Sequence, residues 1–585
     1  MTAKLSVGMA RGVAAWLLVV ALPAAAQQVP VTEHTLPNGL RVLLVERQDD
    51  PSIAAGWVAR VGSANERPGI TGLAHFFEHM MFKGTPTIGT KDAARDLEII
   101  AEQERVREEM RREEAALRAA WRRGEISDPF KPEHATPRYR ELEKEFAKLV
   151  QAQRDLIVPN EFDKIYRNAG AVGMNAYTSQ DLTAYFITVP ANKLELWMWM
   201  ESERILRPVF REFYAERDVV AEERRLRIEA TPTGKFQEAL FALVWESHPY
   251  HWPIIGWPSD LPTLSLAQAQ EFYATYYAPQ NLTLVLVGQF NTADTLPQIE
   301  KYFGRIPRGP RDVPEVVTLE VPAVAEKRMN AEADTNPEVQ ILWKTVGFGH
   351  RDSYPLQILG QVLSTRTGRL YKGLVLDERL ATEAEAGQAS FKYAGLFYIG
   401  AEVAEGRAPA EVEAAIYREL DRLRDEPVPE RELQKVKNNF AAAEYRKLTS
   451  NMAILHQLLR AEGSGRWQEI NEAGPKLQAV TAADLQRVVR TYFTRENRTV
   501  CTYTRKPGPA VPEDPALAGL NAEQRQMVQQ AVAGLAKATD AAKVRAGLGR
   551  LEAQLDSAPP EMKSVLTVIR QKMADRLAEL EAARN

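Results

Sequence analysis

The chain has 585 residues, of which 45% are hydrophobic and 26% charged, so its length and composition indicate a globular protein of two to four domains. The formal net charge of -4 favours neither nucleic acid nor an anionic membrane as a partner. Cys501 is the single cysteine, which excludes an internal disulfide framework and any metal site built from several cysteines.

The N-terminus predicts an export signal over residues 1–26. Lys4 and Arg11 precede the apolar run "GVAAWLLVVALPAAA", and small residues follow it where a signal peptidase would cut, after Ala26. An uncleaved membrane anchor is the alternative, although the run is shorter than the roughly 20 residues that span a bilayer. We expect an exported mature chain, periplasmic if the source is a Gram-negative bacterium.

Two strands and an apolar helix open the mature chain. "TLPNGLRVLLVE" predicts a strand after a Pro-Asn-Gly turn, and "SIAAGWVARVG" predicts a second strand. The helix that follows contains "GLAHFFEHMMFKGT", residues 72–85.

Residues 91–156 differ in kind from their surroundings. Within this charged stretch, apolar residues recur at steps of seven and four and predict a long, coiled-coil-like helix: Ile99, Val106, Met110, Leu117 and Trp121. A Gly/Pro-containing break follows, and the pattern resumes at Tyr139, Leu142, Phe146 and Leu149. We predict an inserted antiparallel helical hairpin, which is either a solvated protrusion packing on itself or a substrate gate or partner-docking arm.

An internal repeat divides the rest of the chain. The segments "SLAQAQEFYATYYAPQNLTLVLV" and "TAADLQRVVRTYFTRENRTVCTY" share a Ser/Thr cap, a helix, an Asn and an apolar strand, at a constant offset of 216 residues. We therefore predict an α+β fold with two homologous halves. The predicted domains are an N-terminal domain 27–300, a Pro-rich linker 301–325, a C-terminal domain 326–507 and a helical tail 508–585.

His75, Glu78 and His79 form the most informative group of residues. Helical residues four apart lie on one face, so both imidazoles can converge on one metal ion, and Zn²⁺ accepts such a pair. Glu78 projects toward the same side, where a carboxylate can take a proton from a water molecule that the metal activates. The full His-x-x-Glu-His set within an apolar helix favours a metal site over a chance meeting of polar residues.

A third ligand has to come from elsewhere in the chain, and "YAERDVVAEERRL" is the best candidate. Glu216 and Glu223 are seven residues apart and share a helix face, whereas Glu222 points away. Spacing alone places Glu223 only slightly ahead of other acidic residues. The segment "HPYHWP", with His248 and His251, is flanked by prolines and reads as a structural loop rather than a second metal site.

The inverted order His-x-x-Glu-His is the mark of inverzincin peptidases. With "GMNAYTSQDLTAYFITVP", "ERDVVAEE" and "HPYHWPIIGW", it resembles the pitrilysin/insulinase family, in its mitochondrial processing peptidase-like branch, over residues 31–505. The resemblance implies two α/β-sandwich-type halves like those of processing peptidases and the metalloenzyme LuxS, and one Zn²⁺ per chain. It also implies site residues: metal ligands His75, His79 and Glu223, general base Glu78, and Glu216 as a carboxylate that orients the site.

The resemblance further implies how substrate is held. Asn175, Ala176 and Tyr177 would lie on an edge strand to which an extended peptide adds by backbone hydrogen bonds. The second half has no His-x-x-Glu-His and should bind no metal. In that half, "GRLYKGLVLDERLATEAEA" offers Arg379 for substrate binding but has Thr382 where the family has a tyrosine. A homodimer, or a heterodimer with a zinc-less homologous subunit, is therefore expected.

The sequence thus predicts an exported zinc metalloendopeptidase that hydrolyses peptides or unfolded polypeptides inside a chamber formed by its halves. One alternative is a non-catalytic structural or partner subunit of the same fold, which the intact site residues disfavour. The other is an interaction module whose working surface is the helical hairpin.

Overall fold

The computed structural model describes residues 28–506, 515–517, 520–536, 538, 540–555 and 557–582, so the predicted export signal lies outside the described residues. The chain divides into two compact units, one ending at Arg505 and the other beginning at Lys506. Within the described ranges, no helix combines the length and the apolar character that crossing a bilayer requires.

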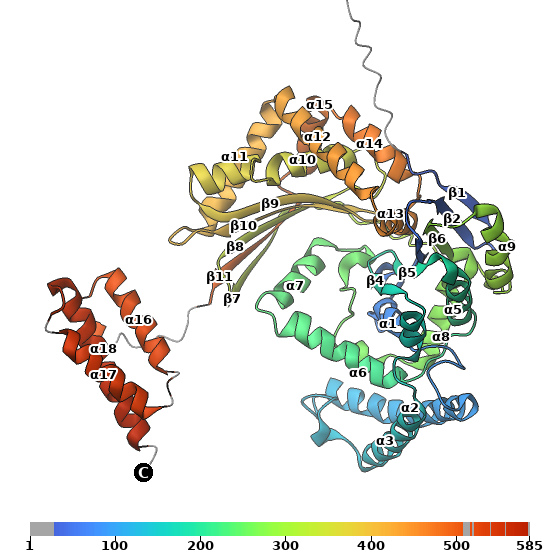
Figure 1. The fold of residues 1–585 in the computed structure, drawn as a ribbon, viewed down its shortest axis with the longest axis horizontal. Coiled ribbons are helices and arrows are strands. Elements are labelled where there is room, and N and C mark those ends of the chain that lie inside the picture. The colour runs from blue at the N-terminus through green and yellow to red at the C-terminus, as the bar shows by residue number, and fades with distance from the viewer. Residues whose placement is uncertain are drawn as a thin grey trace, which may run out of the picture. The chain divides into compact units, whose positions relative to one another are not determined.

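The first half of the larger unit is built on a six-stranded mixed sheet (Figure 1). Its strand order is β1-β2-β6-β3-β5-β4, so β4 is an edge strand. The strands are β1 (Thr32–Thr35), β2 (Arg41–Glu46), β3 (Ser52–Ala59), β4 (Val172–Thr178), β5 (Thr183–Pro190) and β6 (Leu282–Gly288). The two strands predicted at the start of the mature chain are β2 and β3.

The second half repeats this topology in a five-stranded sheet of order β7-β11-β8-β10-β9. In each sheet the last strand of the half is parallel to one neighbour and antiparallel to the other, β6 between β2 and β3 and β11 between β7 and β8. The strands are β7 (Lys327–Ala333), β8 (Glu338–Thr345), β9 (Ala381–Ser390), β10 (Gly395–Val403) and β11 (Arg498–Arg505). The α+β character and the two mixed sheets agree with the predicted fold class.

The repeat detected in the sequence has the same local structure in both halves. Its helices are α8 (Leu266–Tyr276) and α15 (Ala482–Tyr492), and both begin with a capping box in which the N-cap hydroxyl and the third helical residue hydrogen-bond reciprocally. Asn281 Nδ2 donates to Tyr276 O at 2.8 Å, and Asn497 Nδ2 donates to Tyr492 O at 2.8 Å. The shared asparagine therefore fixes the same turn between helix and strand.

Both faces of the first sheet are buried, because side chains alternate along each strand. On β2, Val42 and Leu44 face the main core with the helices of the first half, whereas Leu43 and Val45 face the opposite side. That opposite side is covered by a helix of the second half, α13 (Asn451–Ser464). The remaining helices of the first half are α1 (Leu73–Met80), α4 (Glu161–Asn168), α5 (Leu194–Leu206), α6 (Phe213–Arg224), α7 (Gly234–Val244) and α9 (Thr292–Phe303).

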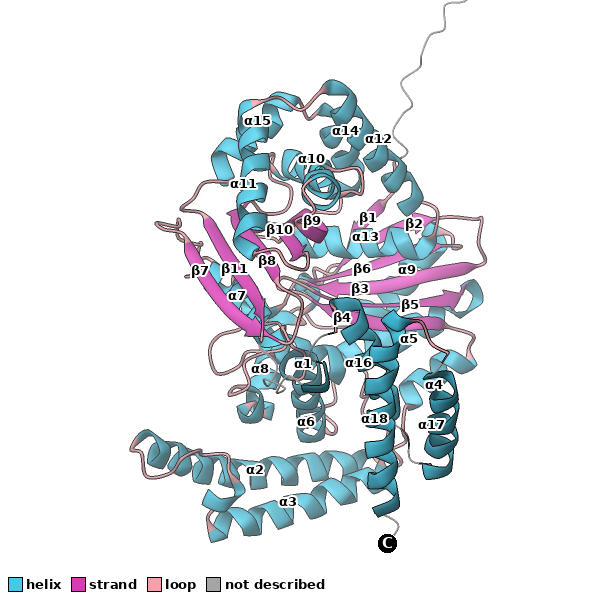
Figure 2. Cartoon of the chain, turned by 90° about the vertical axis from the view of Figure 1, so that its left-hand side faces the viewer, coloured by secondary structure: helices cyan, strands magenta, loops and turns pink. Residues whose placement is uncertain are grey.

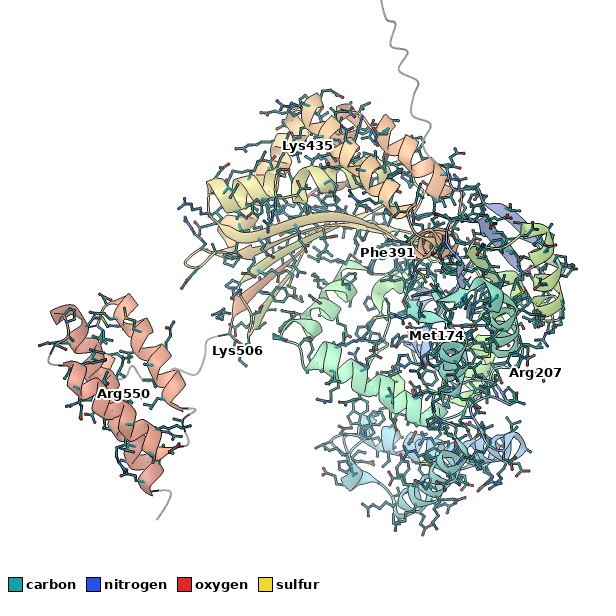
Figure 3. All side chains as sticks on the ribbon, viewed as in Figure 1. Met174, Arg207, Phe391, Lys435, Lys506 and Arg550 are labelled. Carbon is teal, nitrogen blue, oxygen red and sulfur yellow. The ribbon has the colours of Figure 1, made fainter. Side chains whose placement is uncertain are left out.

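The second sheet is covered in a reciprocal way. One face packs on helices of its own half, and the other packs on α7 of the first half, where Leu240 and Trp245 meet Leu342 and Tyr503. Phe391, labelled in Figure 3, contributes to this junction with its ring centroid 5.1 Å from that of Tyr250. The helices of the second half not yet named are α10 (Ser353–Ser364), α11 (Pro409–Asp425), α12 (Glu430–Lys447) and α14 (Glu469–Ala479).

Residues 91–156 contain two long helices that run side by side, α2 (Ala93–Arg122) and α3 (Pro137–Leu156) (Figure 2). Their pairing is antiparallel, since Arg105 pairs with Glu145 and Glu109 pairs with Arg138. The apolar stripe packs between them through Val106, Met110, Leu142 and their neighbours. Trp121 was predicted to belong to this stripe but is 49% exposed, because α2 ends one residue later and the facing helix begins only at Pro137.

The hairpin does not pack only on itself, which excludes the simplest form of the protrusion hypothesis. Asp96 of α2 is buried and pairs with the buried Arg211 at 2.7 Å, and Phe146 of α3 stacks edge-on against Tyr214. Both helices of the hairpin therefore pack on the first half, α2 through Asp96 and α3 through Phe146.

The first residues of the segment predicted as a linker, 301–303, belong to the end of α9. The segment is also held in place: the Glu320 carboxylate accepts hydrogen bonds from the backbone N–H groups of Glu246, Ser247 and His248 and from Lys344 of β8. The smaller unit contains the helices α16 (Ala522–Ala536), α17 (Ala541–Leu555) and α18 (Pro560–Ala582).

Candidate metal centre

The helix that carries the histidines, α1, starts at a tightly packed turn. Gly72 at its N-cap has a φ of 89°, and a Cβ there would lie 2.6 Å from the Ile255 carbonyl oxygen. The buried Glu66 carboxylate accepts from Gly72 N at 2.8 Å and from Ala74 N at 2.7 Å. A carboxylate at this end satisfies N–H groups that the helix itself leaves unpaired.

The apolar face of α1 orients the helix. The side chains of Phe76 and Phe77 are buried, with ring centroids 4.8 Å from Phe213 and 5.7 Å from Phe272 respectively. These contacts turn the face that carries His75 and His79 toward α6, which packs against α1.

Helix α6 brings a carboxylate to the two imidazoles. Glu223 Oε2 lies 3.4 Å from His79 Nε2 and 3.9 Å from His75 Nε2. One ligand atom from each of these three residues lies within 4.8 Å of the other two. Residue spacing could not predict this contact, because Glu223 is far from the histidines along the chain. The exposed Arg227 pairs with the other oxygen, Glu223 Oε1, at 2.7 Å and leaves Oε2 facing the histidines.

Glu216, two turns earlier on α6, contacts the far side of the His79 ring. Its Oε1 lies 2.8 Å from His79 Nδ1, and its Oε2 lies 2.6 Å from Lys83 Nζ. Burial alone would raise the pKa of Glu216, but the hydrogen bond with His79 and the charge of Lys83 outweigh it and lower that pKa to about 2. Glu216 is thus a negative charge that accepts a hydrogen bond from Nδ1–H of His79, and Nε2 is the ring nitrogen that faces Glu223.

The two histidines have different surroundings. Burial, followed by the neighbouring His79, lowers the pKa of His75 to about 4, so its ring is neutral near pH 7. Burial also acts to lower the pKa of His79, but the hydrogen bond and charge of Glu216 raise it overall. Among the described residues, His75 Nδ1 has no hydrogen-bond partner, so Glu216 supports one ring of the pair.

Glu78 lies between these groups and the edge strand. Thr178 Oγ1 of β4 donates a hydrogen bond to Glu78 Oε2 at 2.7 Å. Burial raises the pKa of Glu78 above its ordinary value, although the Thr178 hydrogen bond opposes this shift. A half-buried carboxyl with a raised pKa is the state in which a side chain both accepts and returns a proton near neutral pH.

The donor set fits Zn²⁺. Two imidazole nitrogens and one carboxylate oxygen are ligands that catalytic zinc sites use, and three protein ligands leave a coordination position open. Tetrahedral ligands about 2.0–2.1 Å from the metal lie roughly 3.3 Å apart. The separations of 3.4 and 3.9 Å from Glu223 Oε2 to the two Nε2 atoms are close to that value.

The predicted substrate residues fall in two places. Asn175 is exposed on the edge strand β4. The next residue, Ala176, is buried, and Tyr177 faces the side of the sheet opposite to Ala176, near Phe186 and His456. β4 also contacts α1, so its free edge runs next to the histidines. Arg379 is exposed in the second half and adopts a φ of 51° just before β9.

Sequence reasoning missed three residues that contact the site: Lys83, Thr178 and Arg227. Lys83 and Thr178 lie within segments that the sequence analysis quoted, but only the folded chain shows that they reach Glu216 and Glu78. No pattern in the sequence around Arg227 indicates that it contacts the site. His248 is buried and His251 is half-buried in a short 3₁₀ turn, consistent with a structural loop.

The two-sheet fold and the His-His-Glu group define the class as a zinc peptidase with an inverted motif. Family models agree: "Insulinase (Peptidase family M16)" matches residues 41–123, and "Peptidase M16 inactive domain" matches residues 263–440. The chain belongs to the M16, or insulinase/pitrilysin, family of peptidases. The match to an inactive-domain model covers much of the half that lacks the histidine motif.

Named relatives support this assignment, and solved structures match the fold. The chain is 25% identical over 474 residues to the zinc protease PqqE of Helicobacter pylori, covering 78% of this chain and 89% of that protein. It is 21% identical to the zinc protease YmxG of Bacillus subtilis, covering 80% and 96%. The crystal structure of a protease from Helicobacter pylori matches with a TM-score of 0.66 at 23% identity, covering 82% of this chain and 100% of that one. The periplasmic protease PqqL from Escherichia coli matches the fold with a TM-score of 0.60 at 16% identity, covering 82% and 48%.

Proposed function

We propose that this chain is a zinc-dependent metalloendopeptidase that hydrolyses peptides or unfolded polypeptide segments. The observation that carries the proposal is the convergence of His75 Nε2, His79 Nε2 and Glu223 Oε2 beside Glu78. A zinc ion held by these three residues would polarise a water molecule and the scissile carbonyl.

The chain's own residues then supply the proton transfers. Glu78 accepts a proton from the attacking water and passes it to the nitrogen of the departing amine, so hydrolysis releases a carboxylate and an amine. Thr178 holds the Glu78 carboxylate through its 2.7 Å hydrogen bond. Glu216 keeps His79 in the tautomer that presents Nε2.

The substrate is proposed to bind as an added strand. Among the described strands, the edge strand β4 pairs only with β5, and it contacts α1. An added strand would form backbone hydrogen bonds along Asn175, Ala176 and Tyr177 on its other side. An extended or unfolded segment can make such hydrogen bonds, whereas most backbone groups of a folded protein are already paired within its own structure. Arg379 remains a proposed substrate contact from the second half.

We also propose that the chain is exported, and we propose its domain boundaries and its association with a second subunit. The N-terminal residues 1–26 support export, and the relative PqqL is described as periplasmic. We further propose domains at 27–300 and 326–507, and association as a homodimer or with a zinc-less homologous subunit.

The test uses the purified full chain. Zinc content per chain and cleavage of unstructured peptides are measured with and without chelator, and again for Glu78→Gln. We expect one zinc per chain, activity lost on chelation and restored by zinc, and kcat lowered by about 10²–10⁴-fold in Glu78→Gln with zinc retained. Full zinc occupancy without turnover in the wild type would instead favour the non-catalytic subunit.

A further inference from the structure

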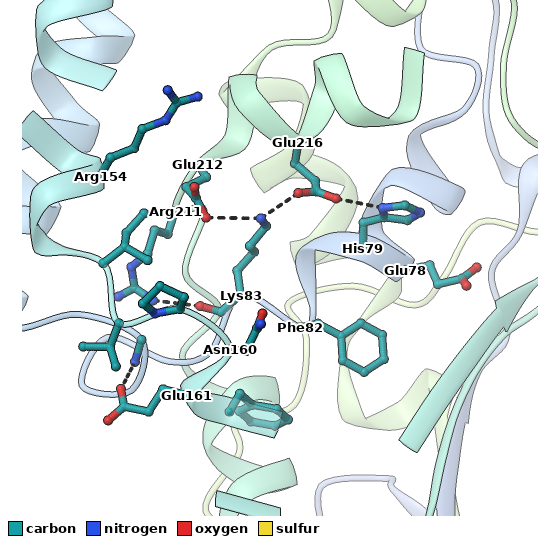
Figure 4. Close-up of a pocket in the computed structure, with 15 residues that line it drawn as sticks. Glu78, His79, Phe82, Lys83, Arg154, Asn160, Glu161, Arg211, Glu212 and Glu216 are labelled. Atoms are coloured by element: carbon teal, nitrogen blue, oxygen red, sulfur yellow. Dashed lines mark hydrogen bonds and ion pairs between the residues drawn. The ribbon is translucent and has the colours of Figure 1, made fainter. Parts of the chain in front are cut away.

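A cavity of about 610 Å³ opens directly beside Glu78 and His79 (Figure 4). Three parts of the chain line it: the end of α1 and the loop after it, the start of α6, and residues 154–162, where the hairpin returns to the first half. A volume in the range of 300–1,000 Å³ is typical of ligand-binding clefts. The inserted hairpin therefore contributes to a space that reaches the proposed catalytic carboxylate.

The base of the hairpin makes one wall of this cavity largely apolar. Ile157, Val158 and Pro159 line it, together with Phe162 of α4 and Phe82 from the loop after α1. These five side chains offer dispersion contacts and an area from which a guest can expel water.

Four charged side chains that line the cavity already have charged partners: Lys83, Arg211, Glu212 and Glu216. Lys83 lies 3.2 Å from Glu212 and 2.6 Å from Glu216, and Arg211 lies 2.7 Å from Asp96. Arg154 is exposed, and in Figure 4 its side chain lies apart from the other labelled charged groups. A guest with an apolar body thus leaves the existing ion pairs intact.

The hairpin wall is tied rigidly to the metal helix. Lys91 N donates to Leu156 O at 2.8 Å and Val158 N donates to Gly89 O at 3.1 Å, which pins the start of the hairpin against its end. Arg211 donates to the carbonyl oxygens of Lys83 and Ile88, at 2.7 and 3.0 Å, in the loop after α1.

Gly89 makes this close approach feasible. Its φ of 99° favours glycine, and a Cβ would lie 2.7 Å from Arg211 Nη1. The wall and the histidine helix consequently share one buried scaffold, so the cavity keeps its shape next to the site.

We propose that this cavity is a substrate subsite that receives one bulky apolar side chain flanking the scissile bond, and that the inserted hairpin supplies its outer wall. The inference rests on the proposed peptidase function. It gives the hairpin a role in substrate selection instead of a role in partner docking.

The test fills the cavity step by step with larger side chains at Val158, which lines it. Val158→Leu, Val158→Phe and Val158→Trp are compared with Val324→Trp, a matched change at an exposed linker valine. The probes are unstructured peptides that are identical except for Phe or Ala at each position flanking the cleaved bond. Zinc content is measured for every variant, and any variant that fails to load zinc is set aside in favour of the next smaller one.

We expect the wild type and Val324→Trp to prefer the Phe peptide by about 10–100-fold in kcat/KM at one flanking position. The preference should shrink as residue 158 grows, while kcat/KM for the Ala peptide stays within about threefold. A preference that survives the largest zinc-loaded variant, or an equal fall for both peptides, would overturn the proposal.

A binding arm separates failure of the subsite from failure of the proposed function. Zinc-loaded Glu78→Gln is titrated with the same fluorescently labelled peptides, with and without the Val158 substitutions. One outcome is that the wild type shows no turnover, while Glu78→Gln binds the Phe peptide selectively and loses this selectivity when Val158→Phe is added. That outcome would support the subsite and contradict the peptidase function. Absence of selectivity in both binding and turnover contradicts the subsite.

Discussion

Glu216 Oε1 lies 2.8 Å from His79 Nδ1, on the side of the ring opposite Glu223. Each of the two ring nitrogens of His79 therefore lies close to a different carboxylate. Partners of this kind fix the tautomer and raise the basicity of a ligating histidine.

Glu216→Gln should therefore weaken zinc binding by about 10–100-fold without removing a ligand. The amide cannot supply the negative charge that now faces both His79 and Lys83. Zinc affinity is measured by competition with a chromophoric chelator. Glu222→Gln is the matched control, because Glu222 is exposed on the same helix and pairs with Arg225. Equal affinities in the two variants would refute the role of Glu216.

Thr178→Val should lower kcat/KM by about tenfold, equivalent to roughly 1.4 kcal/mol, while zinc content stays unchanged. The substitution removes the hydrogen bond that holds Glu78 but keeps the shape of the side chain. Thr178→Ser retains a hydroxyl and should recover most of the activity. If Val and Ser behave alike, the hydrogen bond does not position Glu78.

Asp96→Asn should destabilise the larger unit by about 3–5 kcal/mol, because it leaves the buried Arg211 without its counter-charge. Denaturant unfolding measures the change. Asp155→Asn serves as control, since that side chain is exposed on the same hairpin. A loss below 1 kcal/mol would show that the hairpin is not fastened through this pair.

The junction between the halves should weaken in acid through Glu320. Burial alone would raise the pKa of Glu320, but the hydrogen bonds from Lys344 and from three backbone N–H groups lower it from 4.5 to about 2. Because the folded pKa is the lower one, the stabilisation is complete above about pH 4.5 and is lost as the pH falls toward 2.

The contribution should be on the order of 1–2 kcal/mol after allowance for solvent screening. We expect Glu320→Gln to remove this part of the pH dependence, as measured by unfolding midpoints between pH 2 and 7. Glu315→Gln, at an exposed glutamate of the same segment, should leave it intact. Identical pH profiles for Glu320→Gln and the wild type would contradict the prediction.

Local patterns were enough to predict a large part of this molecule. The relation of His75 to His79 is set by helix periodicity, since four residues bring two side chains onto one face. The repeat likewise predicted two similar halves, because its caps and its asparagine turn act within a few residues. The hairpin was visible in the spacing of apolar residues for the same reason.

Contacts between distant segments were not accessible in this way. Spacing alone left Glu223 among several acidic candidates, and it could not show that Thr178 meets Glu78 or that Asp96 meets Arg211. The same holds for α7 and α13, which each cover the sheet of the other half. Each of these contacts depends on how whole sheets and helices pack.

The sequence by itself determined the donor types, the helix that presents two of them, and the two-half plan, because hydrogen bonding and side-chain periodicity act over neighbouring residues. Spacing did not single out a third ligand, and the family resemblance implied Glu223. Only the tertiary structure shows that Glu223 lies beside the two imidazoles, that Glu216 contacts His79, and that the hairpin base forms a wall beside Glu78. Those outcomes depend on close packing between elements remote in sequence, which local propensity does not encode.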